Sequence, residues 1–153
     1  MLQLMLDTAL FGGLAEDKVK EISEFSEVVT YHEGAQVIVE GIDGQHPDLL
    51  LLVDGEVNVG AKFSPLPTAK EFKLHAIGNE LFGEVSWILG SKRSAGVSCK
   101  KYCKFIRIKG DKFYEYCQTN PAIGVELITR IAAVLAQRVV HLSDQLRNKE
   151  LFS

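Results

Sequence analysis

Hydrophobic residues follow a helical spacing at the start of the chain and a strand spacing after it. Over residues 4–24 the apolar positions fit short helices, and Gly12-Gly13 interrupts them. From Phe25 the period of the pattern changes to two, which predicts strands. The predicted strands are Phe25–His32, Val37–Val39, Leu49–Val53, Glu56–Val59, Glu71–Ala76, Ser94–Ser98 and Tyr102–Ile108. Asp54-Gly55, between two of these strands, predicts a hairpin turn.

Many short strands with glycine-rich turns, and no helices alternating with them, favour an antiparallel β-barrel or jelly roll over residues 25–109. The predicted fold class is therefore mainly β. Short N-terminal helices over residues 4–24 and C-terminal helices over residues 110–148 flank the barrel. We expect residues 1–153 to form a single domain.

The last helix is predicted from Pro121 to Asn148, with Asn120 as its N-cap. Apolar residues recur along it at alternating spacings of three and four, which is the seam of a coiled coil: Val125, Ile128, Ala132, Leu135, Val139, Leu142 and Leu146. A second apolar strip flanks the first half and gives way to Arg138 and His141: Leu127, Ile131 and Val134. We expect the first half to pack on the barrel and residues 122–148 to form a parallel homodimer. The alternative is a helix folded back entirely on its own barrel.

Composition and charge indicate an ordinary globular domain. The 153 residues are 46% hydrophobic and 24% charged. The formal net charge of −3 argues against a general nucleic-acid binder, which needs a basic face. No apolar run approaches the roughly 18 residues that a membrane span needs, and the start of the chain lacks the basic region of a signal peptide. We therefore expect a cytoplasmic protein with neither nucleic acid nor membrane as partner.

The cysteines and histidines do not predict a metal site. Cys99 and Cys103 would lie about 13 Å apart in one extended strand, whereas a disulfide needs Cα atoms within about 7 Å. With Cys117 they are expected to be buried free thiols in a reducing compartment. The four histidines are scattered and form no His-x-His pair, which argues against a cupin-like metal enzyme. No catalytic constellation is visible, and neither a cofactor nor a metal is predicted.

The stretch Phe82–Ala95 combines residues that could bind an anion next to a sugar. Gly83 allows close approach of the backbone, and the residues after it could start a helical turn with free N–H groups. Arg93 offers a planar fork of donors for two phosphate oxygens, and Ser94 adds a hydroxyl. Glu84 can accept hydrogen bonds from sugar hydroxyls. A ligand with one phosphate and one free ribose hydroxyl would satisfy both ends of the stretch.

Phe82-Gly83-Glu84 followed by Arg93-Ser94-Ala95 resembles the phosphate-binding cassette of the cyclic-nucleotide-binding domain. That domain occurs in catabolite activator protein and in the regulatory subunits of cAMP-dependent protein kinase. The resemblance implies that Arg93 and Ser94 hold the phosphate and that Glu84 binds the ribose 2′-hydroxyl. It also implies backbone contacts from Gly83, Val85 and Ser86.

The same resemblance places the base against the long helix, near Leu142 and Ser143. Ser143 could bind an amino group whereas Leu142 could not, so adenine and guanine both stay open. The sequence departs from the family at Ser86 and at Trp87, which either packs in the core or crowds the pocket. The family dimerises through this helix, in agreement with the seam.

The sequence therefore predicts a regulatory module, not an enzyme, that binds cyclic AMP or cyclic GMP and signals through its C-terminal helix. The alternative is a degenerate cassette on a dimeric protein-interaction module that binds no nucleotide. The chain stops at Ser153, so we expect no DNA-binding helix-turn-helix after the long helix.

Overall fold

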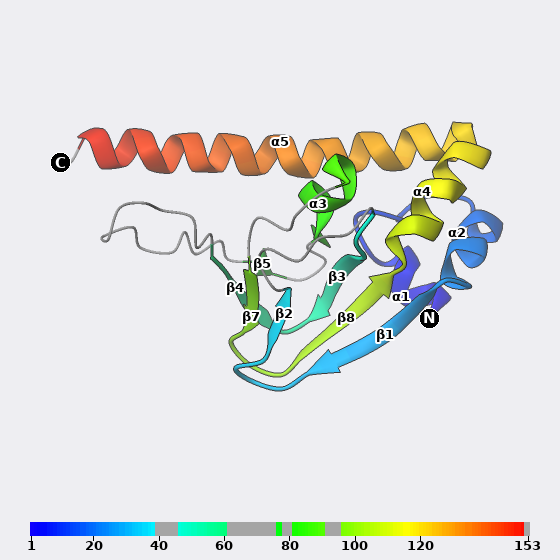
Figure 1. Ribbon diagram of the computed structural model, residues 1–153, viewed down its shortest axis with the longest axis horizontal. Coiled ribbons are helices and arrows are strands. Elements are labelled where there is room, and N and C mark those ends of the chain that lie inside the picture. Colours follow the sequence, from blue (N-terminus) through cyan, green and yellow to red (C-terminus); the bar gives the residue numbers. More distant parts are fainter. Residues whose placement is uncertain (39–45, 61–75, 78–80, 91–95, 152–153) are drawn as a thin grey trace.

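The computed structural model describes residues 1–38, 46–60, 76–77, 81–90 and 96–151 (Figure 1). The helices are α1 (Leu2–Leu6), α2 (Glu16–Ser23), α3 (Glu84–Leu89), α4 (Gly110–Thr119) and α5 (Pro121–Leu151). The strands are β1 (Ser26–Tyr31), β2 (Gln36–Ile38), β3 (Leu49–Asp54), β4 (Glu56–Gly60), β5 (Ala76–Ile77), β6 (Leu81–Phe82), β7 (Gly96–Cys99) and β8 (Cys103–Ile108). Most of the predicted strand 71–76 and the first two residues of the strand 94–98 lie outside the described residues.

The strands form two antiparallel four-stranded sheets, in the orders β1-β8-β3-β6 and β2-β7-β4-β5. Among the described residues no strand pairs across the two sheets, so the predicted closed barrel is not seen there. More of these residues are helical than extended, so the fold is a mixed helix and antiparallel sheet fold rather than mainly β.

The predicted hairpin at Asp54-Gly55 is wrong. β3 pairs with β8 and β6, whereas β4 pairs with β7 and β5. The turn is therefore a corner at which the chain leaves one sheet for the other. Gly55 has a φ of +117°, and a Cβ atom on it would lie 2.6 Å from the Cys103 sulfur. An Asp-Gly pair indicates a tight change of chain direction, but it does not indicate which strands pair on either side of the turn.

Strand β3 is buried on both faces, whereas β1 at the edge of the same sheet has no fully buried residue. Alternate residues of β3 and β8, such as Leu51 and Ile106, pack in a core shared with the helices. Their neighbours, such as Leu52 and Phe105, pack in a second core between the two sheets. This double burial explains the unbroken leucine run 49–52, which has no polar face to alternate with.

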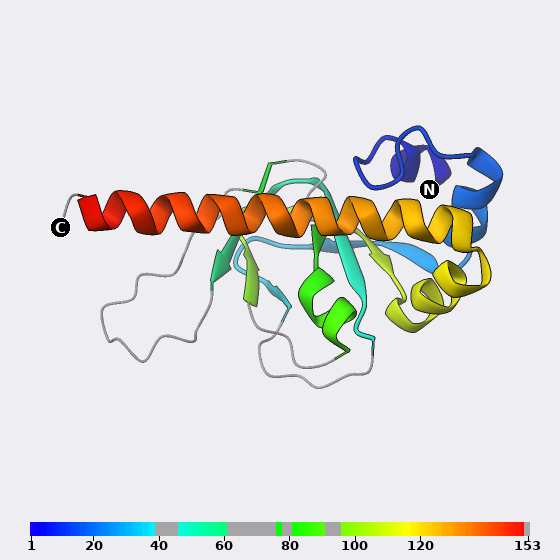
Figure 2. The ribbon, with the colours of Figure 1, turned by 90° about the horizontal axis from the view of Figure 1, so that it is seen from above.

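Helix α5 runs along one side of the molecule, over α3 and the sheets (Figures 1 and 2). Its first half packs inward through Leu127 and Ile131, as predicted, and both side chains are fully buried. Arg130 holds the N-terminal segment, because its Nη1 donates to the carbonyl oxygens of Leu10 at 3.0 Å and Gly12 at 2.7 Å. The helix extends to Leu151, three residues beyond the predicted end.

Five residues of the predicted seam stay exposed in the single chain: Val125, Ile128, Ala132, Val139 and Leu146. Leu135 and Leu142 are half-buried, and Leu135 packs partly against the helix-side core. The second half of α5 therefore presents an apolar strip to solvent.

Helices α4 and α5 cross closely at Gly124. A Cβ atom there would lie 2.3 Å from the Cys117 carbonyl oxygen, which is backbone and cannot rotate away. In an unconstrained helix, Gly→Ala is stabilising by about 1 kcal/mol. We expect Gly124→Ala to do the opposite and to lower the free energy of unfolding by about 1–3 kcal/mol, as overpacking does.

Urea denaturation followed by circular dichroism measures this difference. The control is Gln137→Ala at an exposed position of the same helix, where the change should stay within about 0.5 kcal/mol. A Gly124→Ala variant more stable than the wild type would contradict the close crossing.

Candidate functional site

The predicted cassette begins at a sharp turn between β6 and α3. Gly83, between them, has a φ of +86°, a left-handed conformation that side chains disfavour. Glu84 is the first residue of α3, so the predicted helical turn after Gly83 is confirmed. The turn directs α3 toward α5, which passes over it (Figure 1).

Glu84 lies almost fully buried, at 3% exposure, and forms an ion pair with Arg138 of α5. The Arg138 guanidinium also donates to the Leu81 carbonyl oxygen and lies over the Phe82 ring, 5.3 Å from its centroid. A single arginine therefore contacts strand β6, where the cassette begins, and the first residue of helix α3. Because a buried carboxylate is costly without a partner, this contact compensates the charge of Glu84.

Trp87 packs in the core, which decides between the two roles expected for it. Its Nε1 donates to the Gly110 carbonyl oxygen at 2.9 Å, and its ring lies 5.2 Å from the Phe113 ring, centroid to centroid. Trp87 thus fixes α3 to α4 as Arg138 fixes it to α5. The cassette helix is held by both C-terminal helices.

The other predicted site residues lie in different surroundings. Val85 is half-buried and Ser86 is buried on α3. Ser143 is exposed on α5, five residues beyond Arg138. Arg93 and Ser94 lie outside the described residues, so the structure does not test the predicted phosphate contact.

Sequence reasoning missed Arg138 as a site residue, although a signal for it existed. Leu127, Ile131 and Val134 form the inward strip of α5, and Arg138 is the next position at the same spacing. A cation that continues an inward-facing apolar strip indicates a buried anion opposite it. That anion, Glu84, is 54 residues earlier in the chain.

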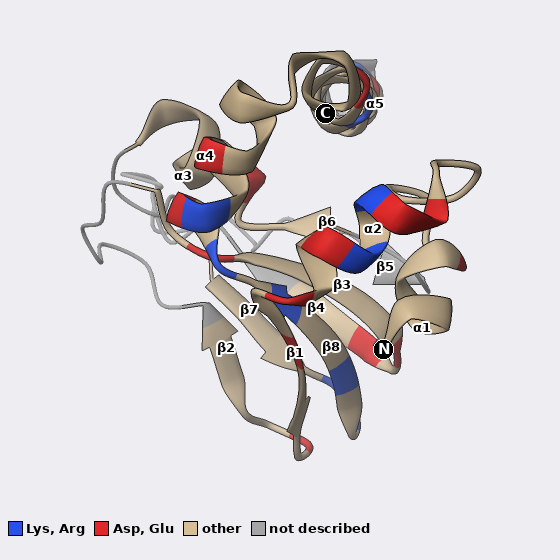
Figure 3. Cartoon of the chain, turned by 90° about the vertical axis from the view of Figure 1, so that its right-hand side faces the viewer, with Lys and Arg blue, Asp and Glu red and all other residues tan. Residues whose placement is uncertain are grey.

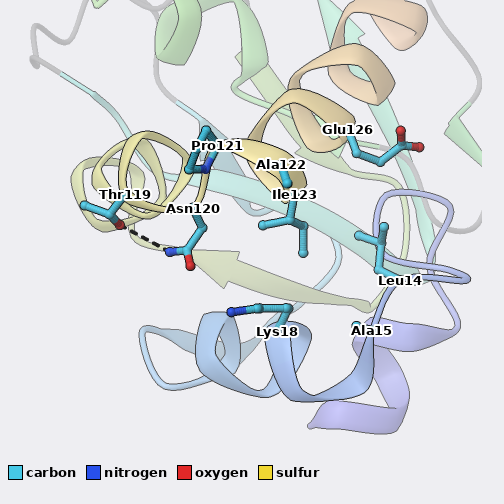
Figure 4. A pocket seen from close by; sticks show the side chains of 9 residues that line it. All are labelled: Leu14, Ala15, Lys18, Thr119, Asn120, Pro121, Ala122, Ile123 and Glu126. Atoms are coloured by element: carbon cyan, nitrogen blue, oxygen red, sulfur yellow. Dashed lines mark hydrogen bonds between the residues drawn. The ribbon is translucent and has the colours of Figure 1, made fainter.

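A separate pocket of about 550 Å³ lies at the junction of α2 with α4 and α5 (Figure 4). It is mostly apolar, and none of the predicted site residues lines it. Its lining residues are Leu14, Ala15, Lys18, Thr119, Asn120, Pro121, Ala122, Ile123 and Glu126. This pocket is distinct from the cassette.

Elsewhere in the described part of the chain, the cysteines, the possible metal ligands and the basic residues form no second site. The three cysteines are free and buried, as predicted. Among the described residues no group of His, Cys, Asp and Glu could hold a metal ion. No described helix has both the length and the apolar character needed to cross a membrane. Lys and Arg are distributed over α2, β8, α4 and α5 (Figure 3).

Comparison with known proteins identifies the fold. No protein-family model matches the chain. A cyclic nucleotide-binding domain from Methylobacillus flagellatus superposes with a TM-score of 0.79 at 24% identity, covering 97% of this chain and 81% of that one. Catabolite Activator Protein of Thermus thermophilus gives 0.70 at 23% identity, covering 92% of this chain and 62% of that one.

A third structure is the regulatory subunit of a cAMP-independent protein kinase A from Trypanosoma cruzi, bound to guanosine. It gives a TM-score of 0.70 at 15% identity and covers 93% of this chain and 50% of that one. The chain therefore has the fold of a cyclic-nucleotide-binding domain, in agreement with the resemblance carried by the cassette.

One curated relative, Glutaminase 2 of Bradyrhizobium diazoefficiens, is 28% identical over 138 residues. The match covers 88% of this chain, but the chain spans about a fifth of the length of that relative. The likeness therefore concerns a part of the glutaminase chain.

The ion pair between Glu84 and Arg138 predicts a measurable coupling between the cassette and α5. Arg138→Ala leaves a buried carboxylate without its guanidinium, so we expect the free energy of unfolding to fall by about 3 kcal/mol. In the double variant with Glu84→Gln the charge is absent, so the loss should be smaller than the sum of the single losses. Denaturant unfolding of all four proteins should give a coupling energy of about 1–3 kcal/mol.

The matched control is the pair Arg107 and Glu27, whose charged atoms are 3.9 Å apart and whose Glu27 side chain is 62% exposed. Its coupling should stay below about 1 kcal/mol. Equal, small couplings for the two pairs would show that Arg138 does not compensate Glu84.

Proposed function

We propose that this domain binds a 3′,5′-cyclic nucleotide, cyclic AMP or cyclic GMP, at the cassette 82–95 and conveys binding through α5. Arg93 and Ser94 hold the phosphate, and Glu84 accepts from the ribose 2′-hydroxyl. Gly83, Val85 and Ser86 supply backbone contacts, and Ser143 approaches the base. Residues 1–153 act as one regulatory domain in the cytoplasm, and its role is binding rather than catalysis.

The contact of Arg138 with Glu84 carries this proposal. It joins the predicted ribose-binding carboxylate to the helix that would respond to a ligand. A ribose hydroxyl that donates to Glu84 changes the partners of a carboxylate already bound to α5. Ligand binding and the position of α5 are then linked through one side chain, and the shift is limited by the difference in ligand affinity between the two positions.

The comparisons support the ligand class but not the choice of base. The Methylobacillus structure is a cyclic nucleotide-binding domain, which supports the ligand class. The Trypanosoma structure is that of a cAMP-independent protein bound to guanosine, a nucleoside without a phosphate, so it does not support a cyclic phosphate. The glutaminase relative does not make this chain an enzyme, because the match covers about a fifth of that protein and says nothing of where its catalysis resides.

A second candidate function is a protein-interaction module without nucleotide, and the exposed apolar residues of α5, such as Val139 and Leu146, favour it. Arg138 already compensates Glu84, so the buried carboxylate needs no ligand to be stable. In this case the useful surface is the exposed strip of α5. The two candidates differ in one measurable property, the binding of cyclic nucleotide.

Calorimetric titration with cyclic AMP, cyclic GMP and 5′-AMP tests the choice. We expect one of the cyclic nucleotides to bind and 5′-AMP to bind far more weakly. Arg93→Ala should weaken the binding by about 1.5–3 kcal/mol, because it removes charge-assisted hydrogen bonds to the phosphate. That loss corresponds to an affinity about 10- to 150-fold lower.

The matched control is Arg107→Ala, which removes a cation from β8, where Arg107 contacts Tyr31 and Glu27. Its affinity should equal that of the wild type. Binding unchanged in Arg93→Ala would refute the phosphate assignment, and no binding of either cyclic nucleotide by the wild type would favour the interaction module.

We also propose that residues 122–148 form a parallel homodimer through the seam. Val139 and Leu146 are more than half exposed in the single chain, and dimerisation would bury them. Replacing both by Glu puts charges into that interface, so the double variant should sediment as a monomer of 16.9 kDa where the wild type has twice that mass.

The control places the same two charges on the opposite face of the helix, as Gln137→Glu with Asn148→Glu, and should remain dimeric. Analytical ultracentrifugation distinguishes the species. A wild type that is monomeric throughout would contradict the dimer, and equal dissociation of both variants would contradict the assignment of the seam.

A further inference from the structure

Cys99 and Cys103 lie at a second corner where the chain passes between the sheets. Cys99 ends β7 in one sheet and Cys103 begins β8 in the other. The expectation that they are far apart assumed one extended strand, and that assumption is wrong. Both side chains instead point into the core between the sheets, at 3% and 0% exposure.

One backbone oxygen draws the two ends of this corner together. The Glu56 carbonyl accepts from the Lys100 N–H at 2.9 Å and from the Cys103 thiol at 3.2 Å. Lys100 is the residue directly after Cys99. The backbone next to Cys99 and the sulfur of Cys103 therefore contact the same carbonyl oxygen, that of Glu56.

The surrounding backbone leaves space for a sulfur atom. Gly55 approaches Cys103 so closely that any side chain on it would collide with the sulfur, at 2.6 Å from its Cβ position. The Cys103 thiol also contacts the Lys101 carbonyl oxygen at 3.3 Å. A disulfide across this corner requires the two sulfurs at roughly 2.05 Å and the two Cα atoms within about 7 Å of each other.

We infer that Cys99 and Cys103 form a reversible intramolecular disulfide across this corner when a low-molecular-weight disulfide acts as oxidant. One cysteine thiolate attacks the oxidant, forming a mixed disulfide and releasing one small thiol. The other cysteine attacks the mixed disulfide, closing the protein disulfide and releasing the second small thiol. The two protein thiols lose two protons and two electrons, and the oxidant gains them.

Burial makes this reaction slow. Burial, and then the neighbouring Cys103 thiol, raise the pKa of Cys99 to about 12, so its thiolate is scarce at neutral pH. The rate of bridging should therefore rise with pH. Cys117 provides an internal reference, because burial raises its pKa to about 11 but it lies in the other core, on α4.

The test is incubation of the reduced, full-length protein in glutathione buffers of increasing oxidised fraction. The protein is then quenched in acid, denatured and alkylated, and its free thiols are counted by mass spectrometry. The wild type should lose two of its three thiols, and Cys117→Ser should lose both of its two. Cys103→Ser should form no internal bridge. A thiol reductant should restore every lost thiol.

Digestion with trypsin identifies which cysteines are bridged, because Lys100 and Lys101 lie between Cys99 and Cys103. Cleavage there separates the cysteine peptides unless a disulfide joins them. The same buffers are applied during refolding from denaturant, so that slow access to the buried thiols cannot hide the bridge. A joined peptide pair supports the inference when it forms in the folded protein, or when the bridged product of refolding has native circular dichroism.

The inference would be overturned if the Cys99 and Cys103 peptides stay separate after both treatments, in protein with native circular dichroism. Oxidation confined to Cys117, or disulfides formed only between chains, would also overturn it. None of these outcomes depends on nucleotide binding, so the proposed function is tested independently.

Discussion

A buried carboxylate is the constraint on which the candidate site depends. Glu84 sits at the first turn of α3, out of water, where a negative charge is stable only with donors around it. Arg138 supplies such donors from α5 and reaches the Leu81 carbonyl as well. The cassette helix and the last helix are therefore parts of one electrostatic arrangement. Trp87 adds an apolar attachment from the same short helix to α4.

Local signals in the sequence predict the elements well. Asn120-Pro121 marks the start of α5, and the change of period at Phe25 precedes β1 at Ser26 by one residue. Gly83 and Glu84 are placed at the turn and the helix start that their residue types suggest. These features depend on a few neighbouring residues, which is why a single sequence contains them.

Features that depend on which strands pair are harder to predict from the sequence. Asp54-Gly55 joins two sheets instead of closing a hairpin, and the corner at residues 99–103 brings together cysteines that a straight strand would separate. The partner of Arg138 lies 54 residues away, so spacing along the chain predicts an inward cation and not its contact. Arg93 and Ser94 remain predictions from the motif.

The anchoring of α5 has a mechanical consequence. Arg130 binds carbonyl oxygens of the N-terminal segment, and Leu127 and Ile131 are buried beside it, so this part of the helix acts as a fulcrum. At about 1.5 Å per residue, the arm from Arg130 to Leu151 is about 30 Å long. A tilt of about 10° at the fulcrum would move the far end by about 5 Å, the rise of one helical turn. Arg138, which contacts the cassette, lies about 12 Å along this arm. Under the proposed coupling, a displacement of Arg138 would be about 2.5 times larger at the far end of the helix.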